Sequence, residues 1–460
     1  MDASTSTPIS KRQKLLEGHN SGASDETRDR LSSLPGKILH HILSFLPTKY
    51  AVGTSILSTS WRYIWTSVPI LDICDHLLFS NERTSGDPIV MRNFMNFVDR
   101  VLLLPEVDLQ KFCLTCEGDL DASRVNAWIS TVIRRKVREL IIEIMLEDSL
   151  AFPRCLFSCE SLKILKINFS DGLTLPTSIS FPRLKVLHFH SIGFCCDESV
   201  QQVSFNCALL EEFQMEECAW LKIKTINIFA PLLKRLEIND HSTYMVAAYD
   251  CEMQIHAENL ISLVLNSGLS CMYFLHNLPS IVNASVDLDS PEDYGPSVIN
   301  LLREICNVKD LTLSRDLIEA LFRPELSTNI PKFSNVTRLR VTGINPFNGS
   351  HLISLLCDMP DIESLNIELQ NCTLGENFLT LATFPQHFLS HLKSVELSSL
   401  YRYDNELCII KFLLQNARVL EKMTINCVAK LSADPSEQLE VCKKLLTLPR
   451  FSARSVIAFS

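Results

Sequence analysis

Residues 184–189 read LKVLHF, and residues 210–215 read LEEFQM. Both stretches have an apolar residue, two further residues, an apolar residue, one further residue and an apolar residue. Fourteen units of this form can be placed in the chain, from VPILDI at 68–73 to LEKMTI at 420–425, and from the second unit onward they follow one another at intervals of about 26 residues. A period of this length predicts a solenoid, in which each unit adds one strand to a curved parallel sheet.

The outer face of such a solenoid carries a helix or an irregular turn in each unit. Residues 87–104, DPIVMRNFMNFVDRVLLL, predict one of these helices, with Asp87 as its cap and Pro88 in its first turn. The segments GPSVINLLREI (295–305) and SHLISLLCDM (350–359) have the same character. Unrelated buried strands of an α/β protein are the alternative, but fourteen copies at a bounded spacing favour an array of leucine-rich repeats.

The repeats are degenerate. The Asn or Cys that usually follows the strand in leucine-rich repeats is mostly replaced, for example by Ser170 and Ile192, and Cys218 is the match among the early units. The individual turns are therefore not defined by the sequence, although the strands are.

The alternation within each unit predicts which side chains face outward. Successive side chains of a strand point to opposite faces, so the apolar positions face the interior and the positions between them face the concave surface. Applied to four neighbouring units, this rule exposes a polar strip with an acidic middle, made of Lys166, Asn168, His188, His190, Glu212, Gln214, Glu216, Arg235, Glu237 and Asn239. Arg338 and Arg340 fall on the same face further along, so we expect a more basic patch there.

We expect this concave surface to hold a partner protein. The side chains assigned to that contact are His188, Glu212, Gln214, Glu216, Glu237 and Arg340. For any single one of them, an ordinary solvated side chain of a sheet face is the alternative interpretation.

Residues 29–73, DRLSSLPGKILHHILSFLPTKYAVGTSILSTSWRYIWTSVPILDI, predict short helices instead of a repeat. Ser32 or Ser33 can cap a first helix with Pro35 in its first turn. Apolar residues at helical spacing give this helix a wide apolar stripe, which consists of Leu34, Ile38, Leu39, Ile42, Leu43 and Leu46.

Pro47 ends the first helix, and two more follow. We expect the second to run from Thr48 or Lys49 to Leu57 and the third from about residue 58 to residue 66, with Trp61 and Trp65 one turn apart on a shared face. Three helices this short cannot bury all of their apolar surface among themselves. The segment therefore needs a neighbour.

Composition excludes several classes of protein. The chain has 460 residues, and because 46% of them are apolar we expect it to fold. Its net charge of −10 shows that it lacks the excess of basic residues that is typical of nucleic-acid-binding proteins. No apolar run is long enough to span a bilayer, and the polar start MDASTSTPISKRQK is unlike a signal peptide. We therefore expect no membrane partner and a cytoplasmic or nuclear location.

No catalytic or metal-binding motif stands out. The chain has no phosphate-binding glycine loop, no nucleophile elbow and no HExxH, and His40 and His41 point to different faces of a helix. The 17 cysteines are scattered through apolar segments and are predicted to be free and buried. Cys113 and Cys116 form one CxxC, but a zinc site needs a second ligand pair, so we expect neither a metal nor another cofactor.

The helical segment closely resembles the F-box of plant F-box and leucine-rich-repeat proteins. The matching residues are Leu34, Pro35, Ile38, Leu39, Ile42, Leu43, Ser44, Phe45, Leu46, Pro47, Thr48, Ser55, Leu57, Ser58, Trp61, Arg62, Trp65, Val68 and Pro69. Residues 391–425, notably FLLQNARVLEKMTI, resemble the FBD module found at the end of such proteins. The family commonly has acidic residues after Leu-Pro, whereas Gly36 and Lys37 stand here, which implies weaker docking.

The resemblance implies a non-catalytic adaptor of a ubiquitin ligase. Its F-box docks on a Skp-type protein, which links it to a cullin and RING assembly, and its repeats hold a protein substrate. The residues that carry the docking are then Leu34, Pro35, Ile38, Ile42, Leu46 and Trp61.

Two alternatives remain open at this point. The first is a repeat scaffold that binds proteins without a link to ubiquitin, which co-purification with a Skp-type adaptor would distinguish. The second is a receptor whose repeats cradle a small anionic molecule, although the mixed charges at the strand positions do not favour it.

The expected fold is α/β: a short helical F-box followed by a curved leucine-rich-repeat solenoid with a parallel sheet. We place a disordered leader at 1–27, the F-box at 28–75, the leucine-rich repeats at 76–380 and FBD-like C-terminal repeats at 381–455.

Overall fold

The computed structural model describes most of the chain between Leu31 and Phe459. The residues inside that span that it does not describe are 32, 79–86, 105–106, 146–151, 171, 196–200, 241–250, 268–270, 289–295, 325, 344–346, 370–371, 374–383, 386, 401–403 and 429–434. The predicted leader at 1–27 and the capping residue Ser32 lie outside the described residues.

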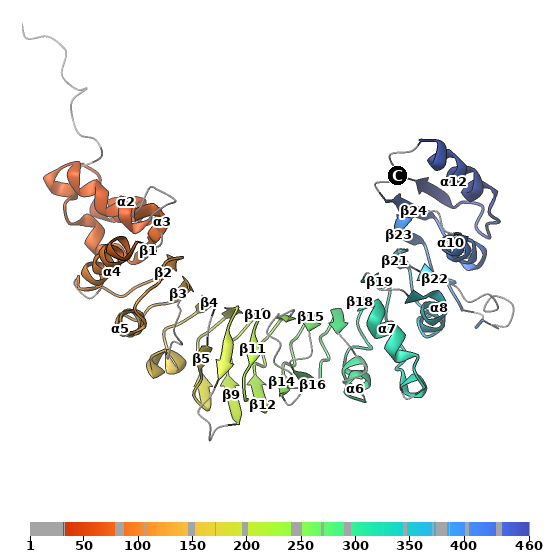
Figure 1. The fold of residues 1–460 in the computed structure, drawn as a ribbon, viewed down its shortest axis with the longest axis horizontal. Coiled ribbons are helices and arrows are strands. Elements are labelled where there is room, and N and C mark those ends of the chain that lie inside the picture. Colours follow the sequence, from red (N-terminus) through yellow and green to blue (C-terminus); the bar gives the residue numbers. More distant parts are fainter. Residues whose placement is uncertain are drawn as a thin grey trace, which may run out of the picture.

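The described chain forms an arc around one long sheet, with the helical segment at one end and the C-terminal strand at the other (Figure 1). All fourteen predicted units form strands of this sheet, in sequence order and parallel throughout. These strands are β1 (Ile70–Cys74), β2 (Lys111–Cys116), β3 (Glu139–Ile144), β4 (Ile164–Phe169), β7 (Val186–His190), β10 (Glu212–Glu216), β13 (Arg235–Asp240), β15 (Ser262–Ser267), β17 (Asn283–Leu288), β18 (Asp310–Ser314), β19 (Arg338–Thr342), β21 (Ser364–Glu368), β23 (Ser394–Leu400) and β24 (Lys422–Cys427).

A fifteenth strand, β25 (Val456–Phe459), follows β24 at the end of the sheet. The sequence did not predict it, because Arg454 stands where the other units have their first apolar residue. Its pairing with β24 in the register Lys422↔Val456 identifies it as the strand of a further unit.

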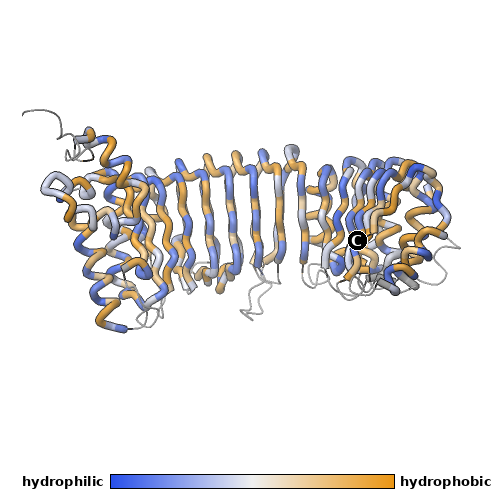
Figure 2. Tube along the Cα trace, turned by 90° about the horizontal axis from the view of Figure 1, so that it is seen from above, coloured by the Kyte–Doolittle hydropathy of each residue, from blue (hydrophilic) through white to orange (hydrophobic). Residues whose placement is uncertain are grey.

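The alternation predicted for the strands is confirmed. On β10, Phe213 and Met215 are buried, whereas Glu212, Gln214 and Glu216 are half-buried on the concave side. Seen from above, neighbouring strands repeat this change between hydrophilic and hydrophobic residues along the whole array (Figure 2). The inward residues join one continuous core that runs from β1 to β24.

The outer face carries helices at both ends of the arc (Figure 1). Its described helices are α4 (Pro88–Leu102), α5 (Ala122–Arg134), α6 (Pro296–Glu304), α7 (Arg315–Leu321), α8 (Gly349–Cys357), α10 (Asp404–Asn416) and α12 (Pro435–Thr447). The helices predicted within 87–104, 295–305 and 350–359 are confirmed, and Asp87 caps α4 by accepting a hydrogen bond from the Ile89 N–H at 2.8 Å.

The middle of the outer face differs from the expected helices and irregular turns, because strands occupy it. Five of them form a second sheet: β6 (Ser178–Ser180), β9 (Gln202–Asn206), β12 (Thr225–Phe229), β14 (Glu252–His256) and β16 (Met272–His276). A smaller sheet holds β5 (Gly172–Thr174), β8 (Gly193–Cys195) and β11 (Ala219–Trp220), and a two-stranded one pairs β20 (Phe347–Asn348) with β22 (Cys372–Thr373). The apolar residues of β9, β12 and β14 alternate with polar ones, and this period of two favours strands.

The N-terminal helical segment contains α1 (Gly36–Leu43), α2 (Thr48–Gly53) and three short 3₁₀ turns at Thr54–Ile56, Thr59–Trp61 and Ile64–Ser67. Two predictions were wrong here. The N-cap position of α1 is Pro35, whose side chain forms no capping hydrogen bond, so the helix begins two residues later than a cap at Ser33 would place it. The third helix is replaced by two of the 3₁₀ turns, since a chain this short follows its tertiary contacts.

The described cysteines carry free thiols, and those at positions 116, 159, 207, 218, 251 and 271 are buried. Cys113 and Cys116 lie on β2, where a spacing of three places their side chains on opposite faces of the strand.

Candidate functional site

The helical segment (residues 34–68) has its own small core. Leu39, Leu43, Ala51, Trp61 and Val68 are each at most 5% exposed and pack together. Larger side chains around them are only partly covered. A core of this size leaves most of the apolar surface of the segment facing outward.

The residues predicted to bind an adaptor divide into two groups. Ile38 and Ile42 are 45% and 38% exposed on α1, Pro35 is exposed, and Leu34 and Leu46 are half-buried beside them. These five side chains are available to a partner. Trp61 is only 4% exposed and lies in the core, so it supports the segment from inside and does not reach a partner in this conformation.

Further exposed apolar side chains were not in the predicted docking set. Ile56 is 89% exposed, Phe45 74%, Tyr63 70%, Leu57 62% and Tyr50 48%. Phe45 and Leu57 were among the residues that matched the F-box pattern, so the resemblance could have added them to the predicted docking residues. For Ile56 and Tyr63 the exposure depends on the 3₁₀ turns, which helical periodicity did not predict.

The helical segment is joined firmly to the repeats through β1. The Asp72 N–H, which points away from β2, donates to the Thr48 hydroxyl oxygen of α2 at 2.8 Å, and Lys49 Nζ donates to the Leu77 carbonyl oxygen. Leu71 and Ile73 on the same strand belong to the core of the array. The edge of the sheet is therefore covered by α2.

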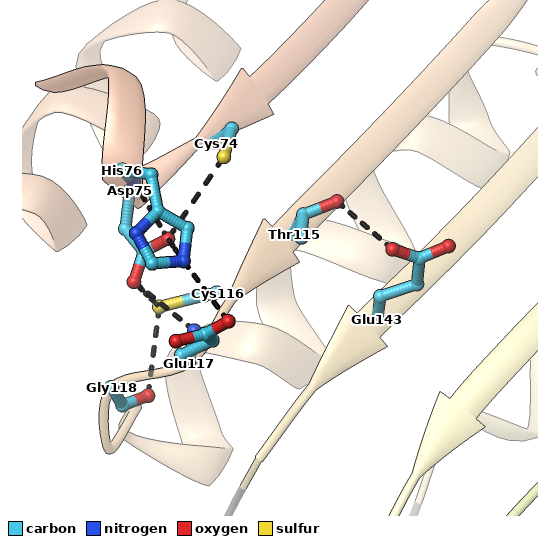
Figure 3. A network of polar contacts seen from close by, with 8 residues as sticks. All are labelled: Cys74, Asp75, His76, Thr115, Cys116, Glu117, Gly118 and Glu143. Carbon is cyan, nitrogen blue, oxygen red and sulfur yellow. Dashed lines mark hydrogen bonds and ion pairs between the residues drawn. The ribbon is translucent and has the colours of Figure 1, made fainter.

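A buried carboxylate closes the same junction (Figure 3). Asp75, at the start of α3 (Asp75–Leu78), accepts hydrogen bonds from the backbone N–H groups of His76 at 2.8 Å and Glu117 at 3.0 Å, and from the Cys116 thiol at 3.4 Å. The ring of His76 lies 3.0 Å from the Glu117 carboxylate, which raises the pKa of His76. Burial, together with Asp75, raises the pKa of the Cys116 thiol, so this thiol stays protonated and donates.

On the concave face, five of the predicted substrate residues lie together. These five are His188, Glu212, Gln214, Glu216 and Glu237. Together with the neighbouring His190, we call them the acidic strip. The backbone register aligns Lys166, His188, Gln214 and Glu237 in one row across β4, β7, β10 and β13, and aligns His190 with Glu216 in the next. The strip thus spans neighbouring repeats at the spacing of adjacent strands.

Glu212 is the centre of an ion-pair chain in the strip. Its carboxylate lies 2.7 Å from His188 Nε2 and also accepts a hydrogen bond from Arg235. The Arg235 guanidinium lowers the pKa of Glu212, and burial lowers the pKa of His188 despite the hydrogen bond with Glu212. His188 is therefore neutral near pH 7, and because a carboxylate only accepts, Nε2 carries the proton.

An open depression lies beside this chain. It is lined by Glu143, Lys166, Asn168, His188, His190, Gln214 and Glu216, among others. His190 Nδ1 lies 3.0 Å from Asn168 Oδ1, and the Glu216 carboxylate is half exposed on its rim. The lining includes the carboxylates of Glu143 and Glu216, which can accept hydrogen bonds from a basic side chain of a partner.

Arg340 lies elsewhere on the concave face. It belongs to β19, four strands beyond β13, where it lines a second depression with Asp310, Thr312, Arg338 and Asn366. Arg338 forms an ion pair with Asp310, and Glu396 closes the other side. The charges of this second region are therefore balanced, and it is less basic than the two arginines alone suggested.

Two properties of the described residues bear on other functions. In the described part of the chain, no group of three or more His, Cys, Asp or Glu side chains could hold a metal ion. None of the described helices has the length and apolar character needed to cross a bilayer.

Models of three protein families match the chain. The model described as F-box domain matches residues 31–73, and the model described as FBD matches residues 382–425. A model of the leucine-rich repeats of the FBD-associated F-box protein At5g56370 matches residues 125–271. The F-box model thus covers the helical segment, and the leucine-rich-repeat model covers the acidic strip.

Relatives from Arabidopsis thaliana extend over most of the chain. F-box/LRR-repeat protein At4g14103 is 31% identical over 358 residues, which cover 74% of this chain and 91% of that protein. F-box/LRR-repeat protein At4g14096 is 30% identical, with 86% of this chain and 88% of that protein covered. FBD-associated F-box protein At1g66310 is 29% identical, with 93% and 95% covered.

Proposed function

The chain belongs to the family of F-box/LRR-repeat proteins, and on this basis we propose that it is the substrate-recognition adaptor of a Skp-, cullin- and F-box-containing ubiquitin ligase. In this role the helical segment binds a Skp-type adaptor, and the concave face of the repeats holds a protein substrate. The chain itself performs no chemistry. The complex acts in the cytoplasm or the nucleus.

One observation supports the docking half of the proposal above all others. The helical segment exposes large apolar side chains around a core of five buried residues. An isolated domain has no reason to keep Phe45 and Ile56 more than 70% exposed, whereas a helical partner that covers them would complete the core. The predicted contacts are Leu34, Pro35, Ile38, Ile42 and Leu46, and Trp61 holds them in place.

The docking test replaces both Leu34 and Pro35 by Ala in the full chain and measures binding to a purified Skp-type adaptor. We expect the adaptor to be lost while the array stays folded, because the repeats have their own core. Ile89→Ala is the matched control, since Ile89 is 66% exposed on α4 outside the segment. Undiminished adaptor binding by the double variant would refute this docking surface, and failure of the parent chain to bind the adaptor would favour a scaffold without a ubiquitin role.

The substrate half rests on the acidic strip. Its carboxylates Glu212, Glu216 and Glu237 lie on neighbouring strands and face the open concave side, so they suit a basic segment of the substrate. Arg340 is proposed as a separate contact in the second depression.

The substrate test compares proteins recovered with the intact chain and with a variant lacking residues 29–66, with the proteasome inhibited. Proteins that accumulate on both define the substrate set. Reversing Glu212, Glu216 and Glu237 to Lys should lower their recovery and leave adaptor binding unchanged. The control reverses Glu160, Glu258 and Glu421, which are exposed away from the strip. Equal recovery with both triple variants would move the substrate site away from the strip.

A further inference from the structure

The two edge strands of the main sheet, β1 and β25, have different surroundings (Figure 1). At the first end, α2 covers β1, and its Thr48 hydroxyl accepts the outward N–H of Asp72. At the other end, β25 is the last strand in the order of the sheet. An uncovered edge strand presents unpaired backbone groups that other strands can join.

The hydrogen bonds of β25 show which of its groups point outward. The Val456 N–H donates to the Glu421 carbonyl oxygen at 2.9 Å, so Val456 and Ala458 direct their backbone groups toward β24. Ile457 and Phe459 therefore direct theirs toward the open edge, because neighbouring residues of a strand alternate. In the described part of the chain no strand lies beyond β25 in this sheet, and neither N–H donates to a backbone oxygen outside the ladder.

The side chains at this end are also incompletely covered. Met423 and Ile425 on β24 are fully buried, but the corresponding Ile457 and Phe459 on β25 are only half-buried. In a solenoid each unit is covered by the next, so the last one leaves apolar surface behind. Other apolar side chains of this C-terminal stretch are exposed as well, namely Leu439, Leu446, Phe451 and Val456.

The charge of this end is opposite to that of the whole chain. Between Arg418 and Phe459 the described residues include six cations and three carboxylates, although the chain carries −10 overall. Three of the cations flank the strand: Lys422 is the register partner of Val456, Arg450 donates to the Ser455 carbonyl oxygen at 3.1 Å, and Arg454 precedes β25 by two residues. An edge with these neighbours favours an acidic partner.

We propose that the outer edge of β25 is a second protein-binding site, which takes an extended, partly apolar segment with acidic residues as an added strand of the sheet. Main-chain hydrogen bonds to Ile457 and Phe459 provide the affinity, and Lys422, Arg450 and Arg454 select acidic segments. A second copy of the chain is the wrong occupant, because pairing two such edges would bring like charges together. This site is separate from the proposed adaptor and substrate surfaces.

The test selects displayed random peptides on the full chain and removes those that also bind Ile457→Pro. A proline is tolerated on an edge strand and deletes the outward N–H. We expect the remaining peptides to alternate apolar residues and to be rich in Asp and Glu. Labelled copies of them should bind Ile457→Pro, and separately Lys422→Glu with Arg454→Glu, about tenfold more weakly than the parent chain.

The charge control is Lys163→Glu with Lys224→Glu, since both lysines are exposed in distant repeats, and it should bind these peptides as the parent does. Three results would overturn the proposal. No peptide sensitive to Ile457→Pro is recovered, the recovered peptides are not acidic, or light scattering shows a dimer of the chain that Ile457→Pro dissociates.

Discussion

The F-box and the repeat array bury their apolar residues in different ways. The F-box has a core of five buried residues and exposes several side chains of similar size, with Ile56 at 89%. In the array, the inward residues of interior strands are buried, as Phe213 and Met215 are on β10. In the array, the apolar surface of each repeat is covered by the next repeat, whereas the apolar surface of the F-box has no neighbour on its outer side.

The strongest test of this contrast is Trp61→Ala. Trp61 is 4% exposed in the small core, and its loss should cost about 3–5 kcal/mol of folding free energy. We expect residues 34–68 to lose protection in hydrogen exchange while β10 and β13 keep theirs. Tyr63→Ala is the control, because Tyr63 is 70% exposed and its removal should leave protection unchanged. If β10 opened together with the F-box, the two regions would not be independent.

A second test separates exposure from stability within the F-box. Phe45 is 74% exposed, so Phe45→Asp should shift the free energy of unfolding by no more than about 0.5 kcal/mol. It should nevertheless weaken binding to a Skp-type adaptor by about 2 kcal/mol, as expected for an anchor in a partner's pocket. Leu446→Asp, at a site 71% exposed on α12, should change neither quantity. Retained adaptor affinity would mean that the exposed face has another use.

The third test uses pH and concerns the array. The folded state lowers the pKa of His188 below 6.5 and that of Glu212 below 4.5, so the unfolded chain binds more protons below each of these values. The contribution of these two groups is therefore complete at neutral pH, begins to fall as pH drops through 6.5, and falls again below 4.5. Urea midpoints measured across this range should show both steps, and His188→Gln should lack the upper one.

His76 at the junction has the opposite sign and serves as the comparison. Its pKa is raised by Glu117, so its contribution is complete below 6.5 and is lost as pH rises through the folded value. His76→Gln should therefore lower the urea midpoint more at pH 6 than at pH 8. A midpoint that His76→Gln and His188→Gln shift with the same pH dependence would contradict these assignments.

The smallest expected effect concerns two glycines. Gly36 begins α1 with no atom within 4 Å of an added Cβ, so Gly36→Ala should stabilise the F-box by about 0.5 kcal/mol through helix propensity. Gly343 in the array has φ +108° beside Arg315, so Gly343→Ala should destabilise the array by about 1–2 kcal/mol. Unfolding monitored by hydrogen exchange in each region would show the opposite signs. If Gly36→Ala and Gly343→Ala changed the free energy of unfolding in the same direction, the expected difference between the two regions would be contradicted.

Periodicity in the sequence determined most of the repeat architecture. A strand of period two with buried apolar positions defines its own inward and outward faces, so all fourteen strands and the members of the acidic strip could be predicted before any contact was known. The F-box pattern likewise singled out Leu34, Pro35 and Ile38 as docking residues, and of these Pro35 and Ile38 are exposed while Leu34 is half-buried.

Other features depended on contacts between residues far apart in the chain. Trp61 is buried because α1 and the 3₁₀ turns close around it, which its spacing from Trp65 did not reveal. Strand β25 forms because β24 offers a free edge, although Arg454 breaks the repeat pattern. The pairing of Arg338 with Asp310 likewise required the register between β18 and β19. A sequence pattern determines which face a side chain occupies, whereas its neighbours are determined only when strands from separate repeats align, because pairing energy depends on distance.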